Sequence, residues 1–132
     1  MDIVAALFVE NIDLHPAFPG GPTQIDLTGV HFSAAPPDPP PVTVAPHLVV
    51  LVRCPPDEEG AGVLEVVFRR DDDQVARNVQ PFQVEPGKFT YRLVRAEVDF
   101  ADYGTVEAHV RVGEGHVTVV PYSLVPGPDP GE

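Results

Sequence analysis

The sequence predicts an all-β protein, a single-domain antiparallel β-sandwich of about seven or eight strands. Three observations support this fold class. The chain has 23 valines and only 3 isoleucines, and the valines stand in short runs; β-branched residues favour strands. Proline (17 residues) and glycine (11 residues) fall mostly between these runs, as turn residues do in sandwiches and barrels. No segment shows sustained 3.6-residue apolar spacing bounded by helix caps.

Length and composition exclude several classes of protein. The 132 residues suit one domain, predicted to span residues 1–125, with a disordered proline- and glycine-rich tail at 126–132. A hydrophobic fraction of 43% excludes a chain too polar to fold. With 8 Lys and Arg against 20 Asp and Glu, the net charge is −12; this predicts no nucleic-acid binding. Without an apolar run of 18 residues, no membrane span is expected.

The first two segments lie near the N-terminus. Residues 2–10 are apolar at both odd and even positions, which indicates a strand that is buried on both faces or covered by another element. A short helix is the alternative. In residues 24–33, Ile25 and Leu27 alternate with polar residues, and after Gly29 the apolar residues move from odd to even positions. A glycine at such a change predicts a β-bulge.

Three segments follow in the middle of the chain. Residues 48–54 are apolar enough for a central strand, and 63–70 alternate as in a half-buried strand. Residues 75–84 contain Pro81, which predicts an edge strand.

The remaining segments are 88–98, 105–112 and 116–125. The last two read as a hairpin, because Val106, Ala108 and Val110 alternate with charged residues. A two-residue turn at 114–115 would place Val112 opposite Val117.

The proline-rich stretch 36–41 is expected to be a stiff, extended surface loop between strands. It contains a PxxP pattern from Pro36 to Pro39. This pattern fits either a rigid connector or a ligand for a partner's groove.

The stretch 89–106 resembles the E–F corner of immunoglobulin-like sandwiches, which often reads Asp-x-Gly-x-Tyr. Asp102 and Gly104 match this pattern, whereas Val106 stands at the tyrosine position and Tyr103 lies between them. The chain has no tryptophan and a single cysteine. The resemblance therefore implies an immunoglobulin-like architecture without the antibody core.

A second resemblance covers most of the chain. The segment 6–11 (Ala-Leu-Phe-Val-Glu-Asn), the segment 25–32 and an apolar strand ending at Arg53 are similar to a family of small bacterial immunoglobulin-like β-sandwich proteins of unknown function. The family's Pro-Gly-aromatic corner would correspond to 86–89 or to 102–104. The resemblance implies a fold and brings no functional residues.

Five aspartates are candidate metal ligands: Asp71, Asp72, Asp73, Asp99 and Asp102. If the two corners that carry them share one end of the sandwich, their carboxylates could converge on calcium, which takes six to eight oxygen ligands. The alternative is a solvated acidic turn. No other cofactor is predicted.

Nothing in the sequence predicts an enzyme. The two serines, Ser33 and Ser123, lie outside any Gly-x-Ser-x-Gly elbow. Cys54 ends a strand of the buried type, as a structural thiol would. No pair of histidines has HxH or HxxxH spacing. We therefore expect a protein without catalytic residues.

The final strand offers a candidate interface at Thr118, Val120 and Tyr122, within the face of residues 118–124. Apolar side chains on a nominally polar face mark interfaces, although the N-terminal strand or the proline-rich loop could cover them instead. We expect an interaction or structural module that binds a protein partner or forms a homo-oligomer, with a cation- or ligand-binding domain as the alternative. No basic n-region precedes the first apolar run, so a cytoplasmic location is expected.

Overall fold

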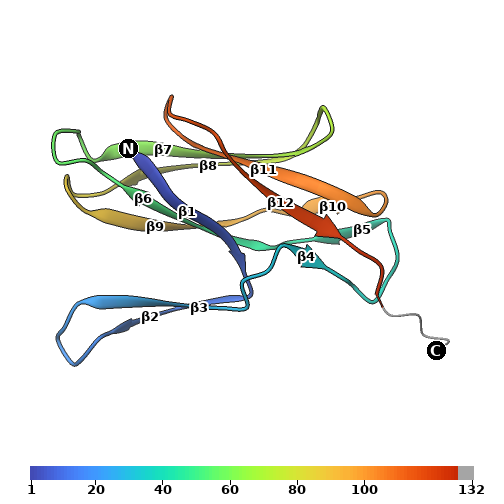
Figure 1. The fold of residues 1–132 in the computed structure, drawn as a ribbon, viewed down its shortest axis with the longest axis horizontal. Coiled ribbons are helices and arrows are strands. Elements are labelled where there is room, and N and C mark those ends of the chain that lie inside the picture. Colours follow the sequence, from blue (N-terminus) through green and yellow to red (C-terminus); the bar gives the residue numbers. More distant parts are fainter. Residues whose placement is uncertain (128–132) are drawn as a thin grey trace.

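A computed structural model describes residues 1–127, and every regular element in it is a β-strand (Figure 1). The strands are β1 (Asp2–Val9), β2 (Asn11–Pro16), β3 (Thr23–Thr28), β4 (Ser33–Ala34), β5 (Val42–Val44), β6 (His47–Arg53), β7 (Ala61–Arg70), β8 (Asp73–Gln83), β9 (Phe89–Arg95), β10 (Val98–Phe100), β11 (Gly104–Val112) and β12 (Thr118–Leu124). Over this part of the chain, no helix is long and apolar enough to cross a membrane. Most of the predicted tail 126–132 lies outside the described residues.

Two larger sheets enclose the core, an arrangement compatible with a β-sandwich. One has the order β1-β6-β9, and the other has the order β4-β12-β11-β7-β8. All their pairs are antiparallel except the short β4–β12 contact. Two further pairs, β10-β5 and β2-β3, stand apart from these sheets. The all-β prediction is confirmed.

The inward faces of the two sheets form one hydrophobic core. Alternate residues of β6, β7, β9 and β11 are at most 1% exposed: Leu48, Val50, Val52, Leu64, Val66, Phe68, Val94, Val106, Ala108 and Val110. The alternation predicted for 63–70 and 105–112 is thus confirmed. Segment 48–54 corresponds to the central strand β6, and segment 75–84 lies in the edge strand β8, as predicted.

The described residues form twelve strands, more than the seven or eight expected. Three of the strands are only two or three residues long: β4, β5 and β10. The strand β2 was not predicted, and the bulge prediction at Gly29 is wrong. Strand β3 ends at Thr28, and Gly29 follows it with φ +67°, a left-handed conformation that favours glycine.

The predicted register of the last hairpin is also wrong, by one residue. Val110 pairs with Thr118 and Ala108 pairs with Val120. The chain turns one residue earlier than predicted, because Gly113 adopts φ +55° and its N–H still donates to Val63 O on β7 (3.0 Å). A shift of one residue moves every side chain of β12 to the opposite face.

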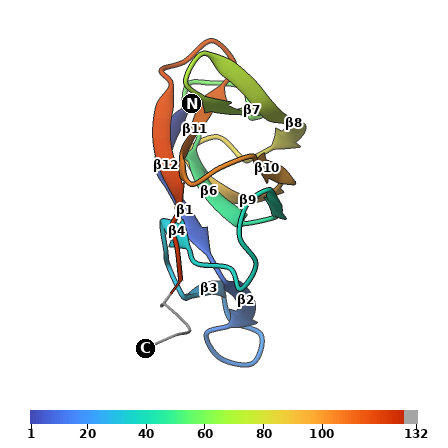
Figure 2. The ribbon, with the colours of Figure 1, turned by 90° about the vertical axis from the view of Figure 1, so that its right-hand side faces the viewer.

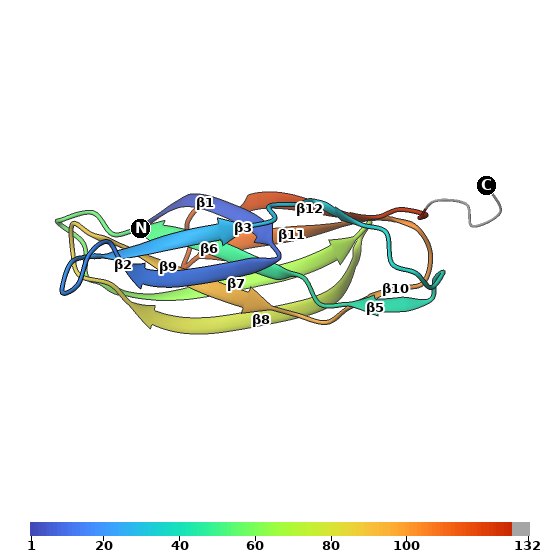
Figure 3. The same cartoon turned by 90° about the horizontal axis from the view of Figure 1, so that it is seen from below.

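Strands β2 and β3 form a protruding hairpin, Asn11–Thr28, here called the arm. Figure 2 shows the arm as a separate layer beside the body, and Figure 3 shows it lying across the sheet that contains β6 and β9. Its base is tied to the body where Glu10 N–H donates to Thr28 O (3.0 Å) and Gly29 O (3.1 Å). Among the described residues, none of the buried core positions belongs to the arm.

Candidate functional site

An open groove of about 970 Å³ separates the arm from the outward face of β6 and β9. The arm lines it with eight residues and the sheet with four, and most of the lining surface is apolar. The apolar side chains are Leu14, Ile25 and Leu27 from the arm, and Leu51, Phe89 and Tyr91 from the sheet. The groove is therefore a slot between two apolar surfaces.

Strand alternation explains both walls of the groove. In the arm, Leu14 pairs with Ile25, and the neighbouring apolar pair is Ile12 with Leu27. Since successive side chains of a strand point to opposite faces, these four residues share one face of the arm. On β9, Val94 points into the core, so Phe89, Tyr91 and Leu93 have the opposite parity and face outward.

The apolar side chains on either side of the groove, and those beside it on the outward face of β6 and β9, differ in how far they are covered. Val49 lies on the outward face of β6, opposite Leu93 in the register, yet it is only 1% exposed. Toward the tip of the arm, Leu14 is 46% exposed and Phe89 is 63% exposed. The apolar side chains around Leu14 and Phe89 therefore form an uncovered mouth.

A polar pair lies on the arm beside this mouth. His15 Nε2 lies 2.5 Å from Asp26 Oδ2, and His15 Nδ1 donates to Pro16 O at 3.2 Å. The Pro16 carbonyl and the Asp26 carboxylate together raise the pKa of His15 above its ordinary value. Both side chains are solvent-exposed, and no serine, cysteine or lysine is among the residues that line the groove. Hydroxyl groups in the lining belong to Thr23, Thr90 and Tyr91, and within the described residues no hydrogen bond joins any of them to His15 or Asp26.

A second polar link fixes the base of the arm. His31 Nδ1 lies 2.8 Å from Gly29 O and must donate to it, since a carbonyl only accepts. His31 Nε2 forms a second hydrogen bond, with the hydroxyl of Tyr122, at 3.1 Å. Burial raises the pKa of Tyr122, whose ring packs edge-on against Phe8 with centroids 4.7 Å apart. The arm is thus anchored to the core through β12.

The five aspartates predicted to bind calcium do not form one site. Asp71, Asp72 and Asp73 are exposed at the β7–β8 turn, and Asp71 adopts φ +55°. Asp99 accepts from Thr43 Oγ1 at 2.5 Å, and Asp102 accepts from the backbone N–H of the next residue at 2.8 Å. Within residues 1–127, no group of three or more acidic, histidine or cysteine side chains could hold a metal ion.

An arginine lies between the corners that carry these aspartates. Arg70, at the end of β7, donates through Nη1 to Asp102 O at 2.8 Å and through Nη2 to Tyr103 O at 2.5 Å. The two corners therefore do approach each other, as the calcium hypothesis required. A guanidinium bound to backbone carbonyls joins them in place of a set of converging carboxylates.

The predicted interface on β12 faces the wrong way. Val120 and Tyr122 are each only 5% exposed and belong to the core, while Thr118 is partly buried. The error follows from the register, because the one-residue shift turns Val120 and Tyr122 inward. The outward residues of this strand include Val119, which is 45% exposed.

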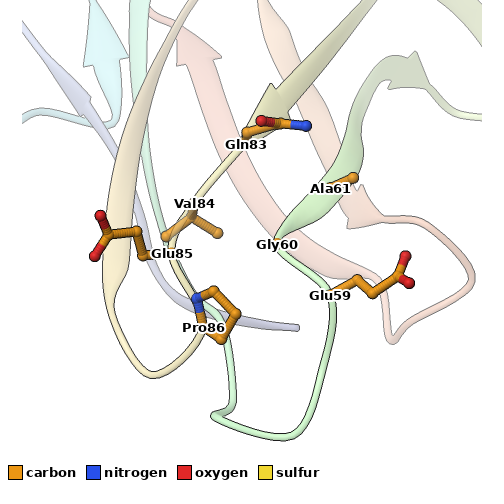
Figure 4. A pocket seen from close by; sticks show the side chains of 7 residues that line it. All are labelled: Glu59, Gly60, Ala61, Gln83, Val84, Glu85 and Pro86. Atoms are coloured by element: carbon orange, nitrogen blue, oxygen red, sulfur yellow. The ribbon is translucent and has the colours of Figure 1, made fainter.

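A smaller depression of about 490 Å³ lies between the β6–β7 and β8–β9 loops. Figure 4 shows the carboxylates of Glu59 and Glu85 pointing away from one another, on opposite sides of it. Glu85 accepts from Lys88 Nζ at 2.7 Å, which lowers the pKa of Glu85. The depression therefore brings no polar groups together.

Sequence reasoning missed the groove because it missed strand β2. A signal was present: Ile12 and Leu14 alternate with polar residues, and so do Ile25 and Leu27 after a Pro-Gly-Gly-Pro turn at 19–22. Two alternating runs around such a turn are typical of a hairpin. The position of the arm over β9 has no comparable signal, because it depends on the backbone at Gly29.

The family resemblances depend on the corners at 102–104 and 86–89. At the first, Tyr103 is 38% exposed, and its hydroxyl forms no hydrogen bond with any described residue. At the second, Gly87 adopts φ +83° and its N–H donates to Cys54 O at 2.8 Å. No protein-family model matches the chain and no curated protein matches it, so membership of the bacterial β-sandwich family stays a prediction.

Proposed function

We propose that this protein is a non-catalytic interaction module that binds an apolar segment of a protein partner in the groove between the arm and the β1-β6-β9 sheet. One observation carries the proposal: apolar side chains line the groove on both sides, and its mouth at Leu14 and Phe89 is uncovered. Contiguous apolar surface rimmed by polar residues is typical of interaction sites.

The charges at the mouth support an uncharged ligand. Arg53, which pairs with Phe89 in the register, lies 3.4 Å from Asp2, and the neighbouring Lys88 is paired with Glu85. The charged groups of these pairs, and those of His15 and Asp26 on the arm, are paired with each other beside an apolar slot. A ligand with a buried unpaired charge would find no partner there.

The backbone of the arm favours an extended peptide over a small molecule. Strands β2 and β3 pair only with each other, so each has one edge of unpaired N–H and C=O groups. Such edges accept an additional strand, with backbone hydrogen bonds supplying affinity and alternate side chains filling the apolar slot.

The proposal includes an immunoglobulin-like body as a rigid support for the arm. The Asp-x-Gly pattern at Asp102 and Gly104 supports this architecture, as do two antiparallel sheets around one core. In such folds binding residues commonly lie on loops and hairpins that the sandwich holds in place.

Selection from a library of displayed peptides tests the proposed function. We expect enrichment of apolar peptides that bind the wild-type chain and bind Leu14→Glu at least tenfold more weakly. The matched control is Val119→Glu, since Val119 is 45% exposed and Leu14 is 46% exposed. Both variants should fold, because substitutions at exposed positions change stability by about 0.5 kcal/mol or less.

Two results would contradict the proposal. One is the absence of any enriched peptide; the other is a set of peptides that bind Leu14→Glu as well as they bind the wild-type chain. Peptides that lose binding only to Val119→Glu would move the site to the opposite sheet.

A further inference from the structure

The tip of the arm has the properties of a ligand for the groove. Residues 17–22 read Ala-Phe-Pro-Gly-Gly-Pro and carry no charge. Phe18 is 62% exposed, although it is the largest side chain of the tip. An exposed aromatic ring at the end of a protruding hairpin is a surface that a partner can bury.

The tip is held in one conformation before any contact is made. Ala17 N–H donates to Pro22 O, and Gly21 N–H donates to Phe18 O, both at 2.8 Å. The ring of Phe18 lies so close to Gly21 that a Cβ there would be 2.9 Å from its carbons. A tip already ordered in this way loses little conformational entropy on binding.

We propose that two copies of this chain form a two-fold symmetric dimer, in which the tip of each arm enters the groove mouth of the other copy and places Phe18 against Phe89. The proposal rests on the proposed function, since it names the ligand of the same groove. One molecule carries both the protruding ring and the unfilled slot, so a two-fold axis satisfies both at once.

The charge distribution allows this contact despite a net charge of −12 per copy. The tip is uncharged, and the charged groups at the mouth are paired: Arg53 with Asp2, Lys88 with Glu85, and His15 with Asp26. Two acidic molecules that approach through these surfaces bring together neutral regions. The acidic β7–β8 turn, with its three consecutive aspartates, belongs to the five-stranded sheet and not to the groove.

The dimensions of the arm predict a weak dimer. Six-residue strands give an arm about 20 Å long and about 10 Å wide, so its tip covers less than about 200 Å² of the partner. Two reciprocal contacts, counted on both partners, therefore bury less than about 800 Å², below the range of stable dimers. A single contact would bury half of this, which is why reciprocity is part of the proposal.

Sedimentation equilibrium from about 10 µM to about 1 mM tests the dimer over the range expected for so small an interface. We expect reversible dimerisation of the wild-type chain. Phe18→Asp and Phe89→Asp should each weaken it at least tenfold, and Val119→Asp should leave it unchanged. Circular dichroism checks that each variant is folded.

A mixing experiment tests the reciprocal geometry. In an equimolar mixture of Phe18→Lys and Phe89→Asp, the mixed dimer keeps one contact intact, between Phe18 and Phe89, and at its second contact the introduced ammonium faces the introduced carboxylate. The average mass of the mixture should therefore exceed that of either variant alone. A mixture that associates no more than its components would overturn the tip-in-groove arrangement.

The remaining outcomes separate this inference from the proposed function. A chain that stays monomeric at about 1 mM while peptides still bind the groove overturns the dimer and leaves the proposed function intact. A dimer insensitive to Phe18→Asp and Phe89→Asp overturns the dimer geometry. If neither association nor groove-dependent peptide binding occurs, both proposals are wrong.

Discussion

The outward face of the five-stranded sheet carries crossed ion pairs, whereas the outward face of β1-β6-β9 is apolar along its centre. On the first face, Glu65 accepts from Arg77 Nη2 at 2.7 Å and lies 3.5 Å from Arg111 Nη2. On the second face, Leu51 and Tyr91 pair in the register, and the arm covers only part of the surface around them. The charged side chains of the first face are well solvated by water, whereas the apolar second face is stabilised when another chain covers it.

This difference shows where a β-sheet protein keeps surface available for binding. Valines on the five-stranded sheet are exposed too, but they stand among charged side chains that pair across strands. Isolated exposed apolar residues of this kind are ordinary. On the other sheet the apolar residues are contiguous and face a second apolar wall, which is the arrangement that makes a groove.

The largest expected effect concerns Val49, a covered residue on the outward face of β6. Val49→Asp places a carboxylate at a position that is 1% exposed, so we expect a loss of roughly 3–5 kcal/mol in the free energy of unfolding. Val119→Asp, on the other outward face, should cost about 0.5 kcal/mol or less. Urea denaturation measures both.

Equal costs for the two variants would break the comparison, because they would mean that Val49 is open to water in solution. A large cost for Val119→Asp would show instead that the five-stranded sheet has a covered face in solution.

A smaller effect concerns the ion pairs. Arg77, which hydrogen-bonds to Glu65, and the nearby Arg111 hold the pKa of Glu65 below its ordinary value of 4.5. The stability that this gives is present above about pH 4.5 and is lost as the pH falls through the folded-state pKa. Glu65→Gln should therefore be less stable than the wild-type chain at pH 6, with a gap that narrows toward pH 3 and in high salt.

Urea denaturation at several pH values tests this expectation, with Glu114→Gln as the control for an exposed glutamate in a turn. A gap between Glu65→Gln and the wild-type chain that is independent of pH would mean that the contribution of Glu65 is packing and not charge.

The smallest effect concerns the arm. The backbone carbonyl of Pro16 and the carboxylate of Asp26 raise the pKa of His15 above its ordinary value of 6.5. The contribution of the protonated His15 to folding stability is fully present below pH 6.5, and it is lost as the pH rises through the raised pKa. In Asp26→Asn, an NMR titration should show the pKa of His15 moving part of the way back toward 6.5.

An unchanged pKa in Asp26→Asn would show that the Pro16 carbonyl alone causes the shift. Asp13→Asn, at the neighbouring position on the same face of the arm, is the control and should move the pKa less.

The sequence predicted the strands whose burial alternates strictly. Val106, Ala108 and Val110 could be assigned to one face because a half-buried strand repeats every two residues. Their partners in β12 could not be assigned, since the register depends on whether the turn begins at Gly113 or at Glu114. The backbone conformation of Gly113 decides between the two registers, and the sequence cannot show which one forms because glycine adopts positive and negative φ about equally readily.

The site was harder to predict than the fold. The groove depends on the angle at which the chain leaves Glu10 and returns at Gly29, which no local pattern specifies. The aspartate hypothesis failed for a related reason. The two corners do meet, but a side chain distant in sequence, that of Arg70, joins them through the backbone oxygens of Asp102 and Tyr103.

The base of the arm has a consequence for how this protein can change over evolution. The chain leaves the body at Glu10 and re-enters it at Gly29, two points joined by a backbone hydrogen bond of 3.1 Å. The segment between them contributes no residue to the described hydrophobic core, so changes in its sequence do not alter the residues that pack there. Selection can therefore act on the recognition element and on the scaffold separately, and the same body can carry arms of different sequence.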